Sequence, residues 1–316
     1  MTDVLGHARA AIARGSKSFA MASQLFDPVT RDRAMLLYAW CRHTDDVIDG
    51  QVLGQGRNDD TRLPAERLAD VERLTELALA GQPTGVPAYD ALARVVRETD
   101  MPPQYPRDLV HGFRIDMEAR PFRTFDDTLA YCYHVAGCVG VMMAIVMGVS
   151  PDDRATLDRA CDLGMAFQLN NIARDVVEDA MNHRRYIPDD WLASVDLAPS
   201  SFAFPPNRRQ LARLVTRLVN AAEDYEASAR FGTPALSWRA AWAVLAAARI
   251  YGGIGRKVRD GGEAALEDRM STSKAEKLQA VAVALSQTLR RKARWPAPGP
   301  ARTGLWTMKS HSLSLP

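Results

Sequence analysis

The stretch that most constrains this 316-residue chain is 164–188, GMAFQLNNIARDVVEDAMNHRRYIP. Between its first glycine and its last proline there is no helix-breaking residue, which predicts a helix through about Asn182. Polar side chains recur along this helix at steps of three or four residues and therefore share one face. They are Gln168, Asn171, Asp175, Asp179 and Asn182. Apolar residues flank this face, so we expect it to look into protein rather than into bulk water.

Two carboxylates on this face, Asp175 and Asp179, lie one helical turn apart. Like charges at this spacing destabilise even an exposed helix by roughly 0.2–0.5 kcal/mol. Beside apolar neighbours the cost rises, because an unpaired buried charge is expensive. A bound cation would remove that cost, so the pattern favours a metal site.

A second acidic cluster ends an earlier predicted helix. Asp27-Pro28 is typical of a helix start and Gly50 of a helix end, which predicts a helix over 28–49. Taken alone, its acidic end is as consistent with a charged helix end in solvent as with a site. Together with the first cluster it predicts a Mg²⁺ site, because this ion prefers oxygen ligands that substrate phosphates complete. One face of this helix carries Tyr38, Arg42, Asp45 and Asp49. The basic residues expected to hold diphosphate oxygens are Arg42, Arg174, Arg269, Lys274 and Lys277.

Helical patterns fill the rest of the chain, and we find no convincing alternation typical of a strand. Hydrophobic residues make up 47% and charged residues 25%, as in ordinary soluble proteins. A net charge of +2 argues against a nucleic-acid-binding surface. We therefore expect one all-α domain over residues 1–295, followed by a flexible tail over 296–316. Further helices are expected over 65–79, 88–97, 107–118, 207–225, 240–250 and 275–290.

The most apolar segment, 129–149, approaches the length of a membrane span. We expect a buried core helix instead, since it carries His134 and three glycines. Along it Ala136, Gly140 and Ala144 repeat every fourth residue, which indicates either close helix packing or open space beside a cavity. The four cysteines form no CxxC pair and the N-terminus lacks a signal-like apolar run, so we expect a reducing, cytoplasmic setting.

Five stretches together resemble the squalene/phytoene synthase family, and within it the bacterial phytoene synthases. They are SKSF at 16–19, YAWCRHTDDVID at 38–49, YCYHVAGCVGVM at 131–142, the 164–188 stretch above, and the late helix that bears Tyr251. Spread from residue 16 to about 275, they cover most of the chain, and the second and fourth are long and specific.

The resemblance implies an isoprenoid-synthase-type helical bundle around a central cavity. It further implies head-to-head condensation of two prenyl diphosphates, with Mg²⁺, or alternatively Mn²⁺, pulling on the diphosphate of one substrate. The alkene of the second substrate would attack the resulting allylic cation to give a cyclopropylcarbinyl diphosphate. Ionisation, rearrangement and proton loss would then convert geranylgeranyl diphosphate to phytoene, and no nicotinamide cofactor is expected.

Site residues follow from the resemblance, position by position. The implied metal ligands are Asp45, Asp49, Asn171, Asp175 and Asp179, with Asp46 as an adjacent helper. Ligand orientation and diphosphate contact are implied for Ser16, Ser18, Arg42, Gln168 and Arg174. Shorter matching motifs add Tyr38, Tyr186, Tyr251, Arg269 and Lys274. The prenyl channel would be lined by Phe19, Tyr131, Val135, Ala136 and Gly140.

Two alternatives stay open at the level of sequence. The acidic motifs do not separate a phytoene synthase from a sister enzyme that makes squalene or dehydrosqualene from farnesyl diphosphate. A non-catalytic helical assembly protein could keep the fold, but it would not need carboxylates at helical spacing. The basic residues after Arg269 indicate either a solvated tail or peripheral contact with anionic lipid.

Overall fold

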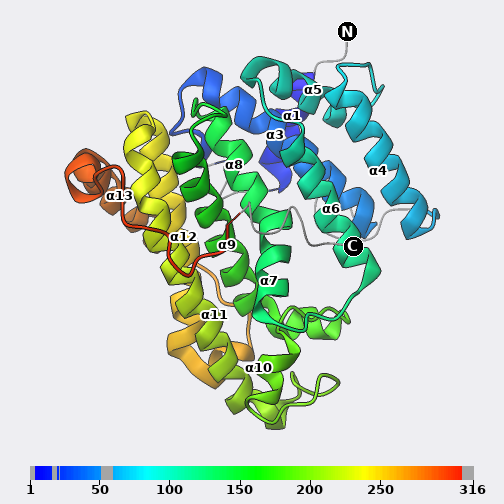
Figure 1. Ribbon diagram of the computed structural model, residues 1–316, viewed down its shortest axis with the longest axis vertical. Helices are drawn as coiled ribbons and strands as arrows, with labels where there is room; N and C mark the ends of the chain where they lie inside the picture. The colour runs from blue at the N-terminus through cyan, green and yellow to red at the C-terminus, as the bar shows by residue number, and fades with distance from the viewer. Residues whose placement is uncertain (1–3, 16–19, 21, 51–59, 308–316) are drawn as a thin grey trace.

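The computed structural model describes residues 4–15, 20, 22–50 and 60–307, and this part of the chain is helical without strands (Figure 1). Ser16, Ser18 and Phe19 of the proposed site lie outside the described residues. The α-helices are α1 (Val4–Gly15), α3 (Pro28–Asp49), α4 (Pro64–Leu79), α5 (Pro87–Thr99), α6 (Gln104–Glu118), α7 (Phe125–Cys132), α8 (Cys138–Val146), α9 (Arg154–Met181), α10 (Asp189–Ala193), α11 (Arg208–Ala229), α12 (Trp238–Gly261) and α13 (Lys274–Arg294). Shorter helical segments are η1 (Tyr133–Gly137), η2 (Pro205–Asn207), η3 (Arg230–Ala235) and η4 (Gly262–Leu266).

The ends of α3 lie where the sequence predicts them. The Asp27 side chain accepts hydrogen bonds from the backbone N–H groups of Val29 and Thr30 at 3.1 and 3.0 Å, which satisfies two donors of the first turn. Gly50 ends the helix in the left-handed conformation, with φ at 65°. By contrast α9 begins at Arg154, so Gly164 lies inside that helix and not at its start.

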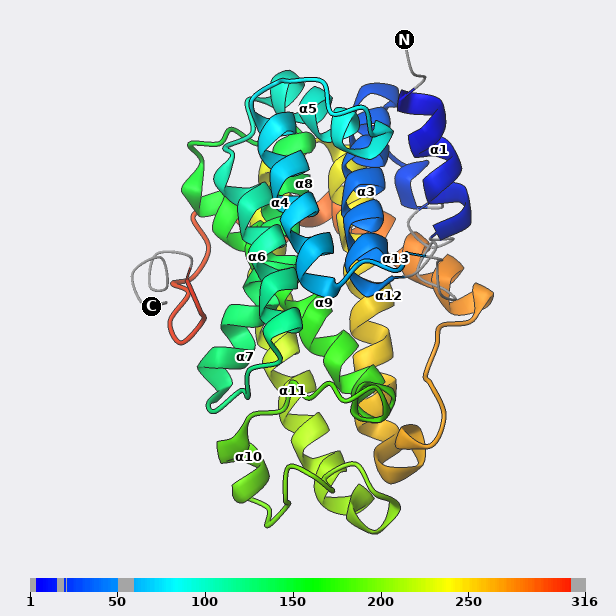
Figure 2. The same cartoon turned by 90° about the vertical axis from the view of Figure 1, so that its right-hand side faces the viewer.

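The long α9 is the central element of the bundle. It packs against α8, η1, α11 and α12, and Figure 2 shows α12 beside it. Both views place α10 at the end of the molecule opposite α5. The core between these helices contains large, fully buried side chains, among them Trp40, Met142, Leu169 and Ile172. This packing fixes α3 and α9 as opposing walls.

The apolar segment 129–149 is a core element, as expected, but it is not one uninterrupted helix. Phe125–Val146 is long and apolar enough to span a membrane, and it alone meets that test among the described residues; 67% of its apolar window is buried within the bundle. A wide π-helical turn, η1, interrupts it at Tyr133–Gly137. Such turns often mark functional sites because they redirect side chains.

Small residues let α8 and α9 approach closely. A Cβ added to Gly140 would lie 2.3 Å from the carbonyl oxygen of Ala160, and one added to Gly164 would lie 2.2 Å from that of Ala136. Gly140 and Ala136 also line a cavity described below. Both interpretations of the small-residue repeat are therefore correct.

Residues 296–307 differ from the flexible tail that the sequence predicts. Arg302 makes a bidentate ion pair with the fully buried Asp162 of α9, at 2.9 and 2.5 Å. The buried Trp306 ring lies 4.6 Å from that of Tyr133, and its backbone N–H donates to the Tyr225 hydroxyl. The expectation of a flexible tail is wrong for residues 296–307. Arg302 pairs with a buried carboxylate of the bundle, and Trp306 packs against a buried aromatic ring.

The close approach of α8 and α9 predicts opposite effects for two glycine substitutions. Gly140→Ala should lower the free energy of unfolding by about 1–3 kcal/mol, because the new Cβ meets backbone that cannot move aside. A Cβ added to Gly253, within α12, would meet no atom within 4 Å. Gly253→Ala should therefore raise the free energy of unfolding by about 0.5–1 kcal/mol. Urea unfolding followed by circular dichroism measures both. Equal effects of the two substitutions would contradict the close contact.

Candidate active site

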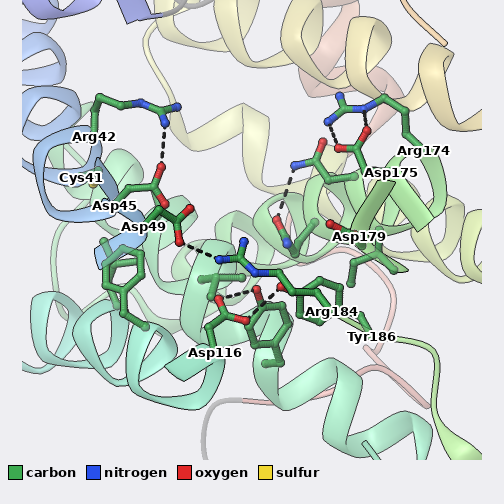
Figure 3. A pocket seen from close by; sticks show the side chains of 18 of the residues that line it. Cys41, Arg42, Asp45, Asp49, Asp116, Arg174, Asp175, Asp179, Arg184 and Tyr186 are labelled. Atoms are coloured by element: carbon green, nitrogen blue, oxygen red, sulfur yellow. Dashed lines mark hydrogen bonds and ion pairs between the residues drawn. The ribbon is translucent and has the colours of Figure 1, made fainter. Parts of the chain in front are cut away.

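A polar cavity of about 430 Å³ opens between α3, α6, η1 and α9. The two acidic helix faces predicted from the sequence form opposite walls: Asp45 and Asp49 lie on α3, and Asp175 and Asp179 on α9 (Figure 3). The same cavity is lined by Tyr38, Cys41, Arg42, Leu109, Phe113, Asp116, Tyr131, Val135, Val139, Gln168, Asn171, Ile172, Arg174, Arg184 and Tyr186.

An apolar cavity of about 390 Å³ adjoins the polar one. The two cavities share Tyr38, Cys41, Val135, Val139, Gln168 and Asn171 as lining residues. The apolar cavity continues past these between α8, α9 and α12, lined by Ala136, Gly140, Phe167 and Tyr251 among others. The rings of Phe167 and Tyr251 stack at 4.5 Å. A charged compartment therefore leads directly into a hydrocarbon-lined one.

Arginines neutralise three of the four wall carboxylates. Arg42 donates to Asp45 at 2.7 Å, and Arg184 donates to Asp49 at 2.7 Å (Figure 3). Asp175 accepts from Arg174 and also from Arg269, whose Nε lies 2.9 Å away.

Asp179 differs from the other wall carboxylates. Its side chain has no ion pair within the described part of the chain. Burial and the nearby charge of Asp175 raise the pKa of Asp179 to about 7. Burial likewise raises the pKa of Asp45 to about 6, against the lowering effect of Arg42. Burial also acts to raise the pKa of Asp175, but Arg174 and Arg269 hold it below its usual value. The cavity therefore holds more negative charge than its arginines compensate.

The donor set fits a hard divalent cation. Among the residues that the structure describes, no three His, Cys, Asp or Glu side chains converge closely enough to enclose an ion by themselves. Mg²⁺ suits such an open arrangement, because it binds through one or two carboxylates and keeps waters or phosphate oxygens as its remaining ligands. The carboxylate of Asp179, which no arginine of the described chain pairs with, supplies the electrostatic reason for a cation.

Sequence reasoning missed Asp116 and Arg184. The Asp116 carboxylate accepts hydrogen bonds from the hydroxyls of Tyr131 and Tyr186, at 2.9 and 3.0 Å, and those two rings stack at 4.7 Å. Burial raises the pKa of Asp116, although Arg184 and both hydroxyls act to lower it. Arg184 lies in the recognised 164–188 stretch, which could have suggested it. Asp116 has no second acid three or four residues away on α6, so no helical pattern pointed to it.

The remaining predicted residues divide by position. Gln168 and Asn171 line both cavities and lie within hydrogen-bonding distance of each other, at 3.4 Å. Arg269 reaches the site only through Asp175. Asp46 and Lys274 line neither cavity, and Lys274 is exposed at the start of α13. The structure therefore does not bring these last two into the site.

The uncompensated Asp179 predicts a pH-dependent effect on stability. A carboxyl whose pKa rises from 3.8 to about 7 on folding contributes stability below pH about 4 that is lost as the pH rises through about 7. In metal-free protein, Asp179→Asn should raise the melting temperature at about pH 8, with a smaller gain at about pH 6. The exposed Asp152→Asn is the control and should change little at either pH. A lower melting temperature for Asp179→Asn at the higher pH would contradict the assignment.

Comparison with known proteins gives a consistent result. The family model described as squalene/phytoene synthase matches residues 12–276. A 15-cis-phytoene synthase of Paracoccus sp. (strain N81106 / MBIC 01143) is 48% identical over 312 residues, which is 99% of this chain and 100% of the relative. A 15-cis-phytoene synthase of Pantoea ananas is 47% identical over 305 residues, or 96% of this chain and 97% of the relative.

Solved structures agree with the sequence comparison. A dehydrosqualene synthase crystallised with a ligand superposes with a TM-score of 0.79 at 27% identity, covering 90% of this chain and 95% of that one. The all-α fold is thus the isoprenoid-synthase type that the sequence predicts. The chain belongs to the squalene/phytoene synthase family.

Proposed function

We propose that this protein is a Mg²⁺-dependent phytoene synthase, which joins two molecules of geranylgeranyl diphosphate head to head through prephytoene diphosphate and releases diphosphate. The observation that carries the proposal is the continuity of the two cavities: one has carboxylates and arginines for a metal–diphosphate group, and the other has apolar walls for prenyl chains. The names of the relatives at 47–48% identity support this choice of product.

The carboxylates of Asp45, Asp49, Asp175 and Asp179, with the amide oxygen of Asn171, would hold the metal. Mg²⁺ would supply charge that stabilises the departing diphosphate; Mn²⁺ is the alternative ion. The arginines that now pair with these carboxylates would turn to the diphosphate oxygens, which guanidinium groups bind in a bidentate manner. They are Arg42, Arg174, Arg184 and Arg269. After this exchange the carboxylates would face the metal and the arginines the diphosphate, so each charged group would keep a partner of opposite charge.

The apolar cavity would protect the allylic cation. Its walls exclude water, which would otherwise capture the cation before the second alkene attacks. The faces of Tyr38, Phe167 and Tyr251 border this compartment, and aromatic faces stabilise a nearby cation by roughly 0.5–2 kcal/mol. The proposed reaction needs no reducing equivalents.

The second candidate function is condensation of two farnesyl diphosphate molecules to dehydrosqualene. We retain it because a solved dehydrosqualene synthase is 27% identical to this chain. Purified protein should be incubated with each diphosphate and Mg²⁺, and the hydrocarbon identified by mass spectrometry. We expect phytoene from geranylgeranyl diphosphate. Dehydrosqualene as the sole product would replace our proposal with the sister activity. A protein that yields no hydrocarbon from either substrate would favour a non-catalytic helical assembly protein.

Substitutions on α3 test the ligand assignment. Asp49→Ala should lower turnover by at least about a hundredfold, because it removes a group that stabilises charge in the transition state. Asp46→Ala, at the adjacent position but outside both cavities, should retain most activity. Circular dichroism checks that both variants are folded. Wild-type turnover in Asp49→Ala would remove α3 from the metal site.

Substrate and product of this reaction are lipids, so we also propose that the protein works in the cytoplasm in peripheral contact with a membrane surface. The basic residues near the C-terminus support this location only in part. Arg302 is committed to the buried Asp162, Arg291 to three backbone carbonyls, and Arg269 to Asp175. The positive charge that remains available lies mainly on α13.

A further inference from the structure

The helix α13 lies at the edge of the bundle, outside α12 (Figure 1). Its inner face packs on α12 through Ala284, which forms a small buried cluster with Leu245, Ala246 and Trp295. The Trp242 indole N–H also donates to the carbonyl oxygen of Val281 at 2.8 Å. One face of α13 is thus committed to the fold.

The opposite face of α13 carries an apolar stripe that no described residue covers. Leu278 is 67% exposed and Leu289 is 76% exposed, the latter the most exposed of the large hydrophobic residues. Residues at steps of three or four share one side of a helix, and the stripe formed in this way is Ala275, Leu278, Ala282, Leu285, Leu289 and Ala293. Leu285 is half-buried and the others are exposed.

Basic side chains border this stripe at its two ends, one at the start of α13 and three at its end. Lys274 and Lys292 project on one side of it and Arg290 and Arg294 on the other, as the 100° turn per residue places them, and all four are exposed. The one acid of α13, Glu276, is committed to the helix start and to Lys257, 2.5 Å away. An apolar stripe with positive charge at both ends is complementary to an anionic lipid surface, where leucine side chains enter the headgroup–acyl boundary and basic side chains meet the headgroups.

This face lies one helix away from the apolar cavity. The outer side of α12 contacts α13, whereas Ala243, Val244 and Ala247 of the same helix line the cavity. Arg291 of α13 donates to the carbonyl oxygens of Thr233 and Leu236, and both of these residues also line the cavity. A surface that held α13 would therefore lie beside the hydrocarbon-binding compartment.

We propose that the exposed face of α13, with Leu278 one turn after Lys274 and Leu289 beside Arg290 and Lys292, docks the protein on an anionic lipid bilayer. The inference rests on the proposed function, because the hydrocarbon product of that reaction is insoluble in water and a docked enzyme would release it beside a lipid phase. It adds to that function the face that meets the membrane.

Vesicle flotation of the full chain tests the proposal. The wild-type protein should float with phosphatidylcholine vesicles that contain phosphatidylglycerol, and less with pure phosphatidylcholine or at raised NaCl concentration. Arg290→Gln/Lys292→Gln should weaken binding about fivefold for each lost charge, hence roughly 30-fold for the pair. Leu278→Glu/Leu289→Glu should abolish flotation. Val29→Glu/Phe204→Glu is the matched control, because both positions are 58% exposed, lie outside α13 and take the same charge change.

Three results would overturn the docking face: no flotation of the wild type with anionic vesicles, flotation of the leucine variant equal to that of the wild type, or equal loss in the control. A wild-type dimer that becomes a monomer in Leu278→Glu/Leu289→Glu, without flotation, would assign the stripe to self-association instead. Phytoene formation in detergent micelles separates the two proposals. The leucine variant should match the wild type there, whereas absence of phytoene in both would reject the proposed activity whatever the flotation result.

Discussion

Electrostatic repulsion between two acidic helix faces is the constraint that organises this molecule. Four aspartates meet across one compartment, and water alone would not screen them at this degree of burial. Arginines interleave with the carboxylates and lower the repulsion without removing it, since Asp179 stays unpaired within the described chain. The negative charge that remains on the carboxylates favours the binding of a metal ion together with a diphosphate ester.

Helix packing supplies the second half of the arrangement. Because α8 and α9 approach through Gly140 and Gly164, little side-chain volume stands between them, and the space beside their crossing remains open to a ligand. The π-helical turn η1 then presents Val135 to both compartments. The junction between the charged and the apolar space is thus built from backbone geometry as much as from the chemistry of side chains.

The sequence predicted those parts of the fold and site that depend on local pattern. The ends of α3 follow from Asp27, Pro28 and Gly50, and the pairing of two acidic faces follows from helical spacing and family resemblance. What escaped prediction depends on contacts between distant segments. Asp116 joins the site only because α6 packs beside the strip that carries Tyr186, and no local pattern encodes that neighbour. Asp46 was proposed as a helper from the family resemblance, but helical spacing already places it off the face that Asp45 and Asp49 share, and it lines neither cavity.

The C-terminal stretch has a consequence for how the protein is made. Asp162 is fully buried in the central helix, and its bidentate partner, Arg302, is separated from it by 140 residues of chain. During translation the counter-charge of this core residue is therefore absent until every helix from α1 to α13 has been synthesised. The ring contact between Tyr133 and Trp306 likewise forms only after Trp306 has been synthesised. Until residues 302–306 have been made, α9 and η1 must therefore pack without these two partners.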